Sequence, residues 1–88
     1  MKLLFERKFL KDISNLNNKK LQSSIEEIIV DVESAKGISE IKNTKKLKGF
    51  KNVYRMKVGE YRLGFLLLNE KIVFVRFMHR KDIYKYFP

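Results

Sequence analysis

The chain has 88 residues, enough for one small domain and too few for a second of ordinary size. It contains no cysteine, so neither a disulfide framework nor a zinc–thiolate site can form. No apolar run approaches the ~20 residues that a helix needs to cross a bilayer, and charges interrupt the N-terminal segment. We therefore expect a soluble cytoplasmic protein with a single domain over residues 1–88.

Charge is distributed unevenly along the chain. The formal net charge is +10, and residues 1–44 hold eight Lys and Arg against seven Asp and Glu. Residues 45–88 hold twelve Lys and Arg against only three Asp and Glu. A basic, well-solvated surface would explain the total charge, but the asymmetry favours a polyanionic partner.

The N-terminal half predicts one strand and two helices. Residues 2–6 form a short strand pattern, and residues 7–16 carry Phe, Ile and Leu on one helical stripe. Asn18 suits the N-cap of a second helix over residues 19–36. The apolar side chains of this second helix recur at helical spacing and predict its buried stripe: Leu21, Ile25, Ile28, Ile29, Val32 and Ala35.

The C-terminal half changes to a period of two after an irregular, lysine-rich segment over residues 38–50. It predicts three strands rich in Val, Ile, Phe and Tyr: Asn52–Val58, Tyr61–Leu68 and Lys71–His79. Gly59-Glu60 fits a two-residue type II′ hairpin turn, and Asn69-Glu70 gives a second hairpin. Residues 80–87 are expected to form one helical turn. The order β-α-α-β-β-β indicates an α+β fold, with an antiparallel sheet, two N-terminal helices on one face, and the other face free for a ligand.

Alternation along these strands sorts the side chains into two faces. The apolar set is expected beneath the helices: Tyr54, Met56, Val58, Tyr61, Leu63, Phe65 and Leu67. Arg55, Lys57 and Arg62 then point to the open face, and Arg80 is expected near it because the last strand ends there. Along the last strand both alternating sets contain apolar residues, so periodicity does not decide which set is buried.

These four cations could meet across neighbouring strands, where like charges repel unless an anion binds between them. Tyr84 follows a few residues later and could stack on a base or donate to a phosphate. The alternative for each residue is an ordinary exposed or ion-paired strand position. As a set, they favour a phosphate site.

Other site chemistries find little support in the sequence. One histidine and no cysteine make zinc ligation a poor prediction, and no Ser-His-Asp arrangement or phosphate-loop glycine spacing can be read. We predict no metal and no cofactor. His79 is read first as a structural residue, and its position beside Arg80 leaves a general-base role open.

Three segments together resemble a known family. Lys46–Gly49, Tyr54–Arg62 and His79–Tyr84 are similar to the series L-x-G, Y-R-x-K-x-G-x-Y-R and H-R-x-D-x-Y of the RelE/ParE superfamily of type II toxin–antitoxin toxins. The resemblance covers most of the chain and is more specific for the superfamily than for a branch. RelE-like members are ribosome-dependent endoribonucleases that cut mRNA in the A site, and ParE-like members poison DNA gyrase.

The RelE-like branch is favoured, and this resemblance implies the site residues. It implies catalytic roles for Arg55, Lys57, Arg62, Arg80 and Tyr84. We also predict that Lys46, Lys48 and Lys51 bind RNA. The RNA 2′-hydroxyl would attack the adjacent phosphate, with Lys57 or His79 accepting the proton. The sequence departs from the pattern in two ways: Arg55 stands where RelE has a lysine, and only four residues follow Tyr84.

Family resemblance also implies partners. We expect a cognate antitoxin with an acidic binding segment, together with mRNA and the ribosome, and no membrane. The toxin alone is expected to be a monomer. Two other functions stay open: a ParE-like gyrase inhibitor, and a non-catalytic nucleic-acid-binding module.

Overall fold

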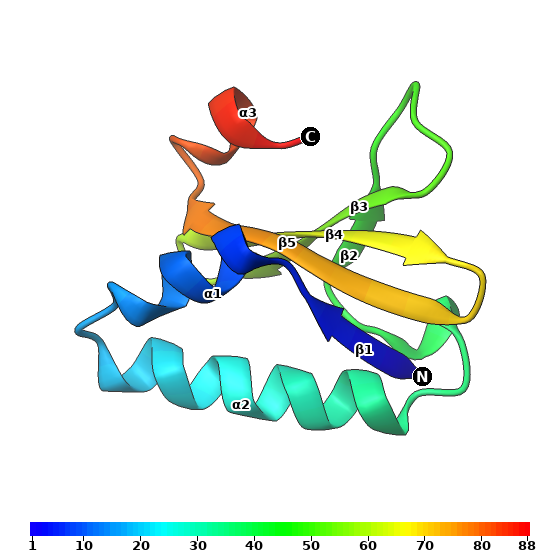
Figure 1. Cartoon of the computed structure of the whole chain (residues 1–88), viewed down its shortest axis with the longest axis horizontal. Helices are drawn as coiled ribbons and strands as arrows, with labels where there is room; N and C mark the ends of the chain where they lie inside the picture. The colour runs from blue at the N-terminus through cyan, green and yellow to red at the C-terminus, as the bar shows by residue number, and fades with distance from the viewer.

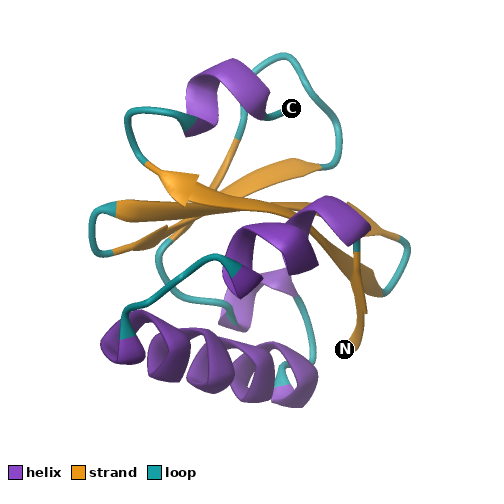
Figure 2. Ribbon diagram, turned by 60° about the vertical axis from the view of Figure 1, so that its left-hand side comes forward, coloured by secondary structure: helices purple, strands orange, loops and turns teal.

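The computed structural model describes residues 1–88, in which five strands and three α-helices follow one another with one short 3-10 helix. Their bounds in chain order are β1 Lys2–Phe5, α1 Arg7–Ser14, α2 Lys19–Ser34, η1 Ile38–Glu40, β2 Thr44–Lys46, β3 Val53–Val58, β4 Tyr61–Leu68, β5 Lys71–His79 and α3 Ile83–Tyr86. Helices α1 and α2 lie on one side of the sheet, and α3 lies on the other (Figures 1 and 2). None of the helices is both long and apolar enough to pass through a membrane.

The five strands form a mixed sheet in the order β1-β5-β4-β3-β2. The α+β class, the two N-terminal helices and the predicted antiparallel pairings of β3 with β4 and β4 with β5 are confirmed. The sheet is not wholly antiparallel, because β1 pairs parallel with β5. No hairpin joins these two strands, so their connection does not impose an antiparallel direction. The segment predicted as irregular also contains β2, an edge strand antiparallel to β3.

Local sequence signals fix the turns and one helix start. Gly59 has a φ of 60° and Glu60 does not have a positive φ, which matches the φ pattern of the predicted type II′ turn. Asn69 takes the left-handed conformation at φ 57°, which asparagine tolerates better than most residues. The Asn18 side chain accepts a hydrogen bond from the N–H of Leu21 at 3.1 Å, so its predicted role as N-cap is confirmed.

The main core lies between the sheet and helices α1 and α2. Its twelve buried residues come from both helices, from the segment between α2 and β2, and from the facing side of β3, β4 and β5: Phe9, Ile25, Val32, Ala35, Ile41, Met56, Val58, Leu63, Phe65, Ile72, Phe74 and Phe77. Tyr54, Tyr61 and Leu67 pack against this cluster, so the predicted inward face of β3 and β4 is confirmed.

The opposite face of the sheet is only partly open, which corrects the prediction of a free face. Ile83 and Phe87 from the C-terminal segment bury themselves against Val53 in a second small cluster. Gly64 makes this possible, because a Cβ at that position would lie only 2.6 Å from the Phe87 ring. Helix α3 thus covers part of this face and leaves the rest exposed.

Strand β5 carries a β-bulge that explains why its alternation could not be read. Arg76 lies opposite Gly64, and Phe74 lies opposite Phe65, so Val75 is the extra residue. The bulge shifts the alternation by one residue, so Phe74 before it and Phe77 after it both face the main core. On the other face of β5, Val75 and Met78 pack against the second cluster, so apolar residues occur on both faces of this strand.

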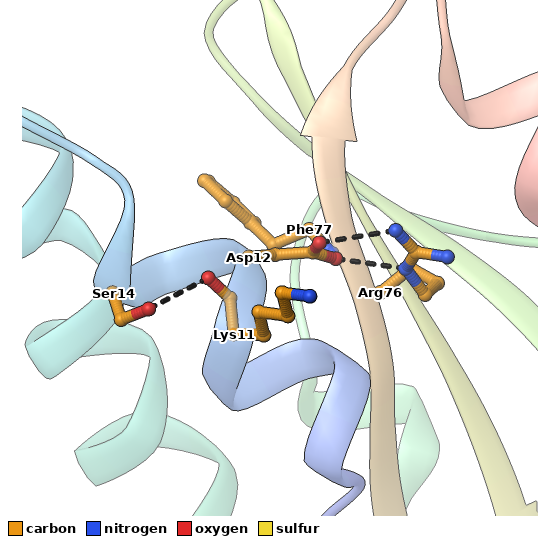
Figure 3. Close-up of polar contacts among 5 residues, drawn as sticks. All are labelled: Lys11, Asp12, Ser14, Arg76 and Phe77. Atoms are coloured by element: carbon orange, nitrogen blue, oxygen red, sulfur yellow. Dashed lines mark hydrogen bonds and ion pairs between the residues drawn. The ribbon is translucent and has the colours of Figure 1, made fainter.

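An aspartate from α1 completes the edge of β5 beyond the point where β1 ends. Strand β1 pairs with β5 only as far as Phe74. Asp12 then accepts hydrogen bonds from the N–H of Phe77 at 2.9 Å and from Nε and Nη2 of Arg76 at 2.8 and 3.0 Å (Figure 3). Arg76 also lies 5.6 Å from the Tyr86 ring, so this ion pair links α1, β5 and α3.

Candidate nucleic-acid interface and active site

The strand register brings three of the predicted cations together. Lys57 on β3 lies directly opposite Arg62 on β4, and Arg55 lies two residues earlier on the same side of β3. Adjacent strands are about 5 Å apart, so these side chains leave the sheet next to one another. Strand β2 adds Lys45 opposite Arg55, which directs Lys45 to the same side. We call these four residues the cationic face: Lys45, Arg55, Lys57 and Arg62.

No acidic side chain forms an ion pair with the cationic face. The two ion pairs in the structure are Arg76–Asp12 and Arg80–Glu60. Four cations held on adjacent strands repel one another, and a phosphate that binds between them would relieve the repulsion with charge-assisted hydrogen bonds. The electrostatics of this face therefore suit a polyanion.

Arg62 is held in place by the turn that precedes it. Its Nη1 donates to the carbonyl oxygens of Gly59 at 2.9 Å and Tyr61 at 2.8 Å. A guanidinium has five N–H donors, so the remaining donors are available for an oxyanion. The turn thus restricts Arg62 before any ligand binds, which reduces the cost of ordering it.

Tyr84 reaches the cationic face from α3. Its ring lies over the Arg55 guanidinium, with 4.5 Å between Cζ and the ring centroid, a cation–π distance. The neighbouring Ile83 is completely buried, whereas Tyr84 is 68% exposed. Burial of Ile83 therefore fixes the helix and leaves the aromatic ring facing outward beside the cations.

Arg80 lies just past the end of β5 and is held at the Gly59-Glu60 turn. Its N–H donates to the Glu60 carbonyl at 2.8 Å, and its Nε pairs with Glu60 Oε2 at 2.6 Å. Arg62 donates to the carbonyl of the adjacent Gly59, so both arginines lie at the same turn. The Arg80–Glu60 pair is largely exposed, and exposed pairs contribute little stability, so an incoming anion can displace Glu60 at low cost.

His79 is placed apart from these cations. Its ring contacts Tyr61 edge-on at 5.6 Å, and Tyr61 stacks on Phe77 of the main core. Nδ1 of His79 accepts a hydrogen bond from the N–H of Lys81 at 3.1 Å. This hydrogen bond uses the Nδ1 lone pair within the turn that follows β5. This geometry favours the structural reading of His79.

The three lysines predicted to bind RNA are all exposed, and two of them border a depression next to Arg55. Its volume is about 310 Å³, and it is lined by Lys45, Lys46, Leu47, Lys48, Phe50 and Arg55. Lys51 is not part of it. Sequence reasoning missed Lys45 and Phe50 as site residues. Lys45 could have been found only by predicting β2, whereas Phe50 is signalled by an aromatic residue inside a run of lysines.

A larger hollow of about 510 Å³ lies between α2 and the C-terminal end of β3. Its lining combines Asp31 and Glu40 with Lys42 and Lys57, among apolar and small polar residues. The two carboxylates offset the two lysines, whereas the cationic face has no acidic partner, so we place the candidate phosphate site on the cationic face. Nowhere do three or more His, Cys, Asp or Glu side chains gather closely enough to hold a metal ion.

Known proteins resemble this chain over nearly its whole length. Residues 3–84 match the family model described as "ParE toxin of type II toxin-antitoxin system, parDE". Toxin RelE3 of Methanocaldococcus jannaschii is 38% identical over 89 residues, and the match covers 100% of both chains. The crystal structure of the RelB-RelE antitoxin–toxin complex from Methanococcus jannaschii contains a chain with 36% identity and a TM-score of 0.81, covering 97% of this chain and 99% of that one. The archaeal RelE-RelB complex from Pyrococcus horikoshii shares the fold, with a TM-score of 0.71, 19% identity and coverage of 90% and 93%.

Proposed function

We propose that this chain, which belongs to the RelE-like branch of the RelE/ParE superfamily of type II toxin–antitoxin toxins, is an endoribonuclease that cleaves mRNA on the ribosome. The matching family model carries the ParE name, but the full-length relative at 38% identity is a RelE toxin, and we follow the full-length match for the branch. The observation that carries the proposal is the gathering of Lys45, Arg55, Lys57 and Arg62 on one sheet face without an acidic counter-ion.

In the proposed reaction the RNA supplies its own nucleophile. The 2′-oxygen forms a bond to the adjacent phosphorus, and the bond from phosphorus to the 5′-oxygen breaks, which leaves a 2′,3′-cyclic phosphate and a 5′-hydroxyl. Neutral Lys57 accepts the 2′-hydroxyl proton, and a proton from the resulting ammonium or from water reaches the 5′-oxygen. Arg62 lies opposite Lys57 on the neighbouring strand, so the residue that accepts the proton and an arginine that would bind the phosphate lie next to each other.

The arginines would stabilise the charge that develops on the phosphoryl oxygens. Arg62 has donors left after its two bonds to the turn, and Arg80 gains donors when it leaves Glu60. Arg55 would hold a neighbouring phosphate, and Tyr84 above it would stack on a base or orient the leaving group. Neither the general base nor the order of proton transfer depends on a metal ion in this scheme.

We further propose a cognate antitoxin whose acidic segment binds the cationic face. The chain's net charge of +10 gives such a segment strong electrostatic complementarity. The M. jannaschii structure is described as a RelB-RelE antitoxin–toxin complex, and its toxin covers almost the whole of this chain at 36% identity. These two observations support a bound antitoxin as the resting form.

The test is to induce the chain in a host cell and map mRNA 5′ ends. We expect new 5′ ends at positions linked to codons, because ribosome-dependent cleavage follows the reading frame. Arg62→Ala and Arg80→Ala should each lower cleavage by about a hundredfold or more. Arg7→Ala, an exposed arginine on α1, is the matched control and should cleave normally. Normal cleavage by Arg62→Ala would remove this site assignment.

The second candidate is a ParE-like gyrase inhibitor, which the name of the matching family model favours. This function predicts intact mRNA and a DNA-damage response in the induced cells. It also predicts that the purified chain blocks supercoiling by purified gyrase. Intact mRNA together with normal gyrase activity would leave a non-catalytic nucleic-acid-binding module. Mapping 5′ ends in the induced cells and assaying supercoiling by purified gyrase therefore separates the three functions.

A further inference from the structure

The loop between β2 and β3 is fixed from its inner side. The N–H of Leu47 donates to the Val53 carbonyl at 2.9 Å, which closes the loop, and the Leu47 side chain packs against the cluster of Val53, Ile83 and Phe87. Gly49 takes a φ of 84°, a conformation that side chains disfavour, and so reverses the chain just before Phe50. Figure 1 shows this loop rising on the same side of the sheet as α3. Leu47 thus anchors the loop, and Phe50 is left exposed to solvent.

Phe50 is the residue that the loop presents. Phe50 is 47% exposed, whereas Leu47, three residues earlier, is partly buried against the second cluster. Phe50 and Leu47 line the 310 Å³ depression, and the other lining residues are all cationic: Lys45, Lys46, Lys48 and Arg55. A lone exposed apolar side chain is ordinary. An aromatic one ringed by four cations, without a carboxylate in the lining, matches the chemistry of single-stranded nucleic-acid sites, where bases stack on aromatic rings and cations follow the backbone.

The depression is continuous with the candidate active site through Arg55. This residue lines the depression, belongs to the cationic face, and carries the Tyr84 ring at 4.5 Å. A nucleotide whose phosphate is bound by Arg55 would therefore have its base within reach of the ring of either Phe50 or Tyr84. The two aromatics lie on different elements, one on the β2–β3 loop and one on α3.

We infer that this depression is a nucleobase subsite for single-stranded RNA, in which Phe50 stacks on a base beside the nucleotide held at Arg55. Lys45 and Lys48 bind the flanking phosphates. The inference deepens the proposed endoribonuclease function, because it names a substrate contact, Phe50, that is not among the residues assigned to catalysis. Stacking on a phenyl ring accepts any base, so this subsite adds affinity with little sequence preference.

The chain has no tryptophan, which gives a direct test by fluorescence. Phe50→Trp in the full chain retains a stacking surface and introduces a unique fluorophore. We expect its emission to be quenched by a short single-stranded RNA whose scissile 2′-hydroxyl is replaced by hydrogen, so that binding is seen without cleavage. An abasic oligonucleotide of equal length and charge should leave the emission nearly unchanged. Val30→Trp, at an exposed position on α2, is the matched control and should respond to neither.

Affinity measurements complete the test. Phe50→Leu keeps apolar volume but removes the aromatic face, and we expect it to weaken binding of the base-containing RNA by roughly tenfold or more. Binding of the abasic oligonucleotide should not change. Equal weakening for both oligonucleotides, no weakening, or a loss confined to antitoxin binding would each overturn the inference. Because these readouts need no cleavage, they stand apart from the test of the proposed activity: a chain that cuts mRNA normally with Phe50→Leu refutes the subsite alone.

Discussion

Asp12→Ala should destabilise the fold more than any exposed substitution, although Asp12 lies outside the candidate site. Asp12 accepts two hydrogen bonds from Arg76 and one from the N–H of Phe77, and both side chains of the ion pair are only about 15% exposed (Figure 3). The substitution leaves a mostly buried guanidinium unpaired and a backbone donor unsatisfied. Breaking such a pair costs about 3 kcal/mol at the lower end of the range for buried ion pairs.

This loss is large for a chain of this size. A domain of 88 residues has a free energy of unfolding of roughly 4–13 kcal/mol. A loss of about 3 kcal/mol should lower Tm by roughly 12–24 °C. Urea unfolding followed by circular dichroism measures the free energy, and calorimetry measures Tm. Asp31→Ala, an exposed position on α2 with no ion pair, is the control and should change stability by less than about 0.5 kcal/mol.

A double variant separates the charge from the packing. In Asp12→Ala/Arg76→Met both charges are absent, and only the N–H of Phe77 lacks its partner, so stability should recover to within about 1–2 kcal/mol of the wild type. A single variant that loses less than about 1 kcal/mol, or a double variant no more stable than the single one, would refute the reasoning.

The pH dependence of the same ion pair has a defined sign. The hydrogen bond that Arg76 donates to Asp12 raises the pKa of Arg76, outweighing the opposing effect of burial. A cation whose folded-state pKa is raised contributes its full stabilisation below the ordinary pKa and loses it only as the pH rises through the raised value. The cost of Asp12→Ala should therefore be constant between about pH 7 and about pH 10, far below the range in which arginine titrates. A cost that fell steadily across this window would contradict the assignment.

Three further predictions concern the candidate site. Glu60→Gln should leave stability within about 1 kcal/mol, because its pair with Arg80 is exposed, yet should raise RNA affinity and steepen its salt dependence in binding titrations. Gly64→Ala should cost about 1–3 kcal/mol in denaturant unfolding, since the new Cβ would lie 2.6 Å from the Phe87 ring, and unchanged stability would contradict this packing. Tyr84→Phe retains the ring over the guanidinium and should keep most cleavage activity, whereas Tyr84→Ala should lose roughly tenfold or more; equal loss in both would instead assign the role to the hydroxyl.

Local rules predicted the part of the fold that two tight turns control. Gly59 fixes the register of β3 against β4, and register then determines that Lys57 lies opposite Arg62. Alternation along β3 could be read because its outward set is polar after Val53. The cationic face therefore follows from a turn signal and a period of two, both of which are local in sequence.

The parts that could not be predicted depend on contacts between distant segments. Strand β2 contains two lysines, which have low strand propensity, and it exists because it pairs with β3 at the sheet edge, where lysines also discourage unwanted pairing. The bulge at Val75 breaks the period of β5. The other face of β5 packs against the cluster that contains Phe87, so both faces of this strand carry apolar residues. The placement of His79 also depends on tertiary contacts, since its neighbour Tyr61 belongs to another strand.

The cationic face also connects the two partners that we propose. Its four cations have no acidic partner within the chain, so the free protein retains their mutual repulsion, and any polyanion that binds there relieves it. An acidic antitoxin segment and a strand of RNA would relieve the same repulsion at the same residues, which means that they cannot bind together. A ligand present at a hundred times its dissociation constant adds about 2.7 kcal/mol to the free energy of unfolding. The antitoxin would therefore both stabilise the toxin and block its substrate through one set of contacts, and the removal of antitoxin alone would be enough to activate the enzyme.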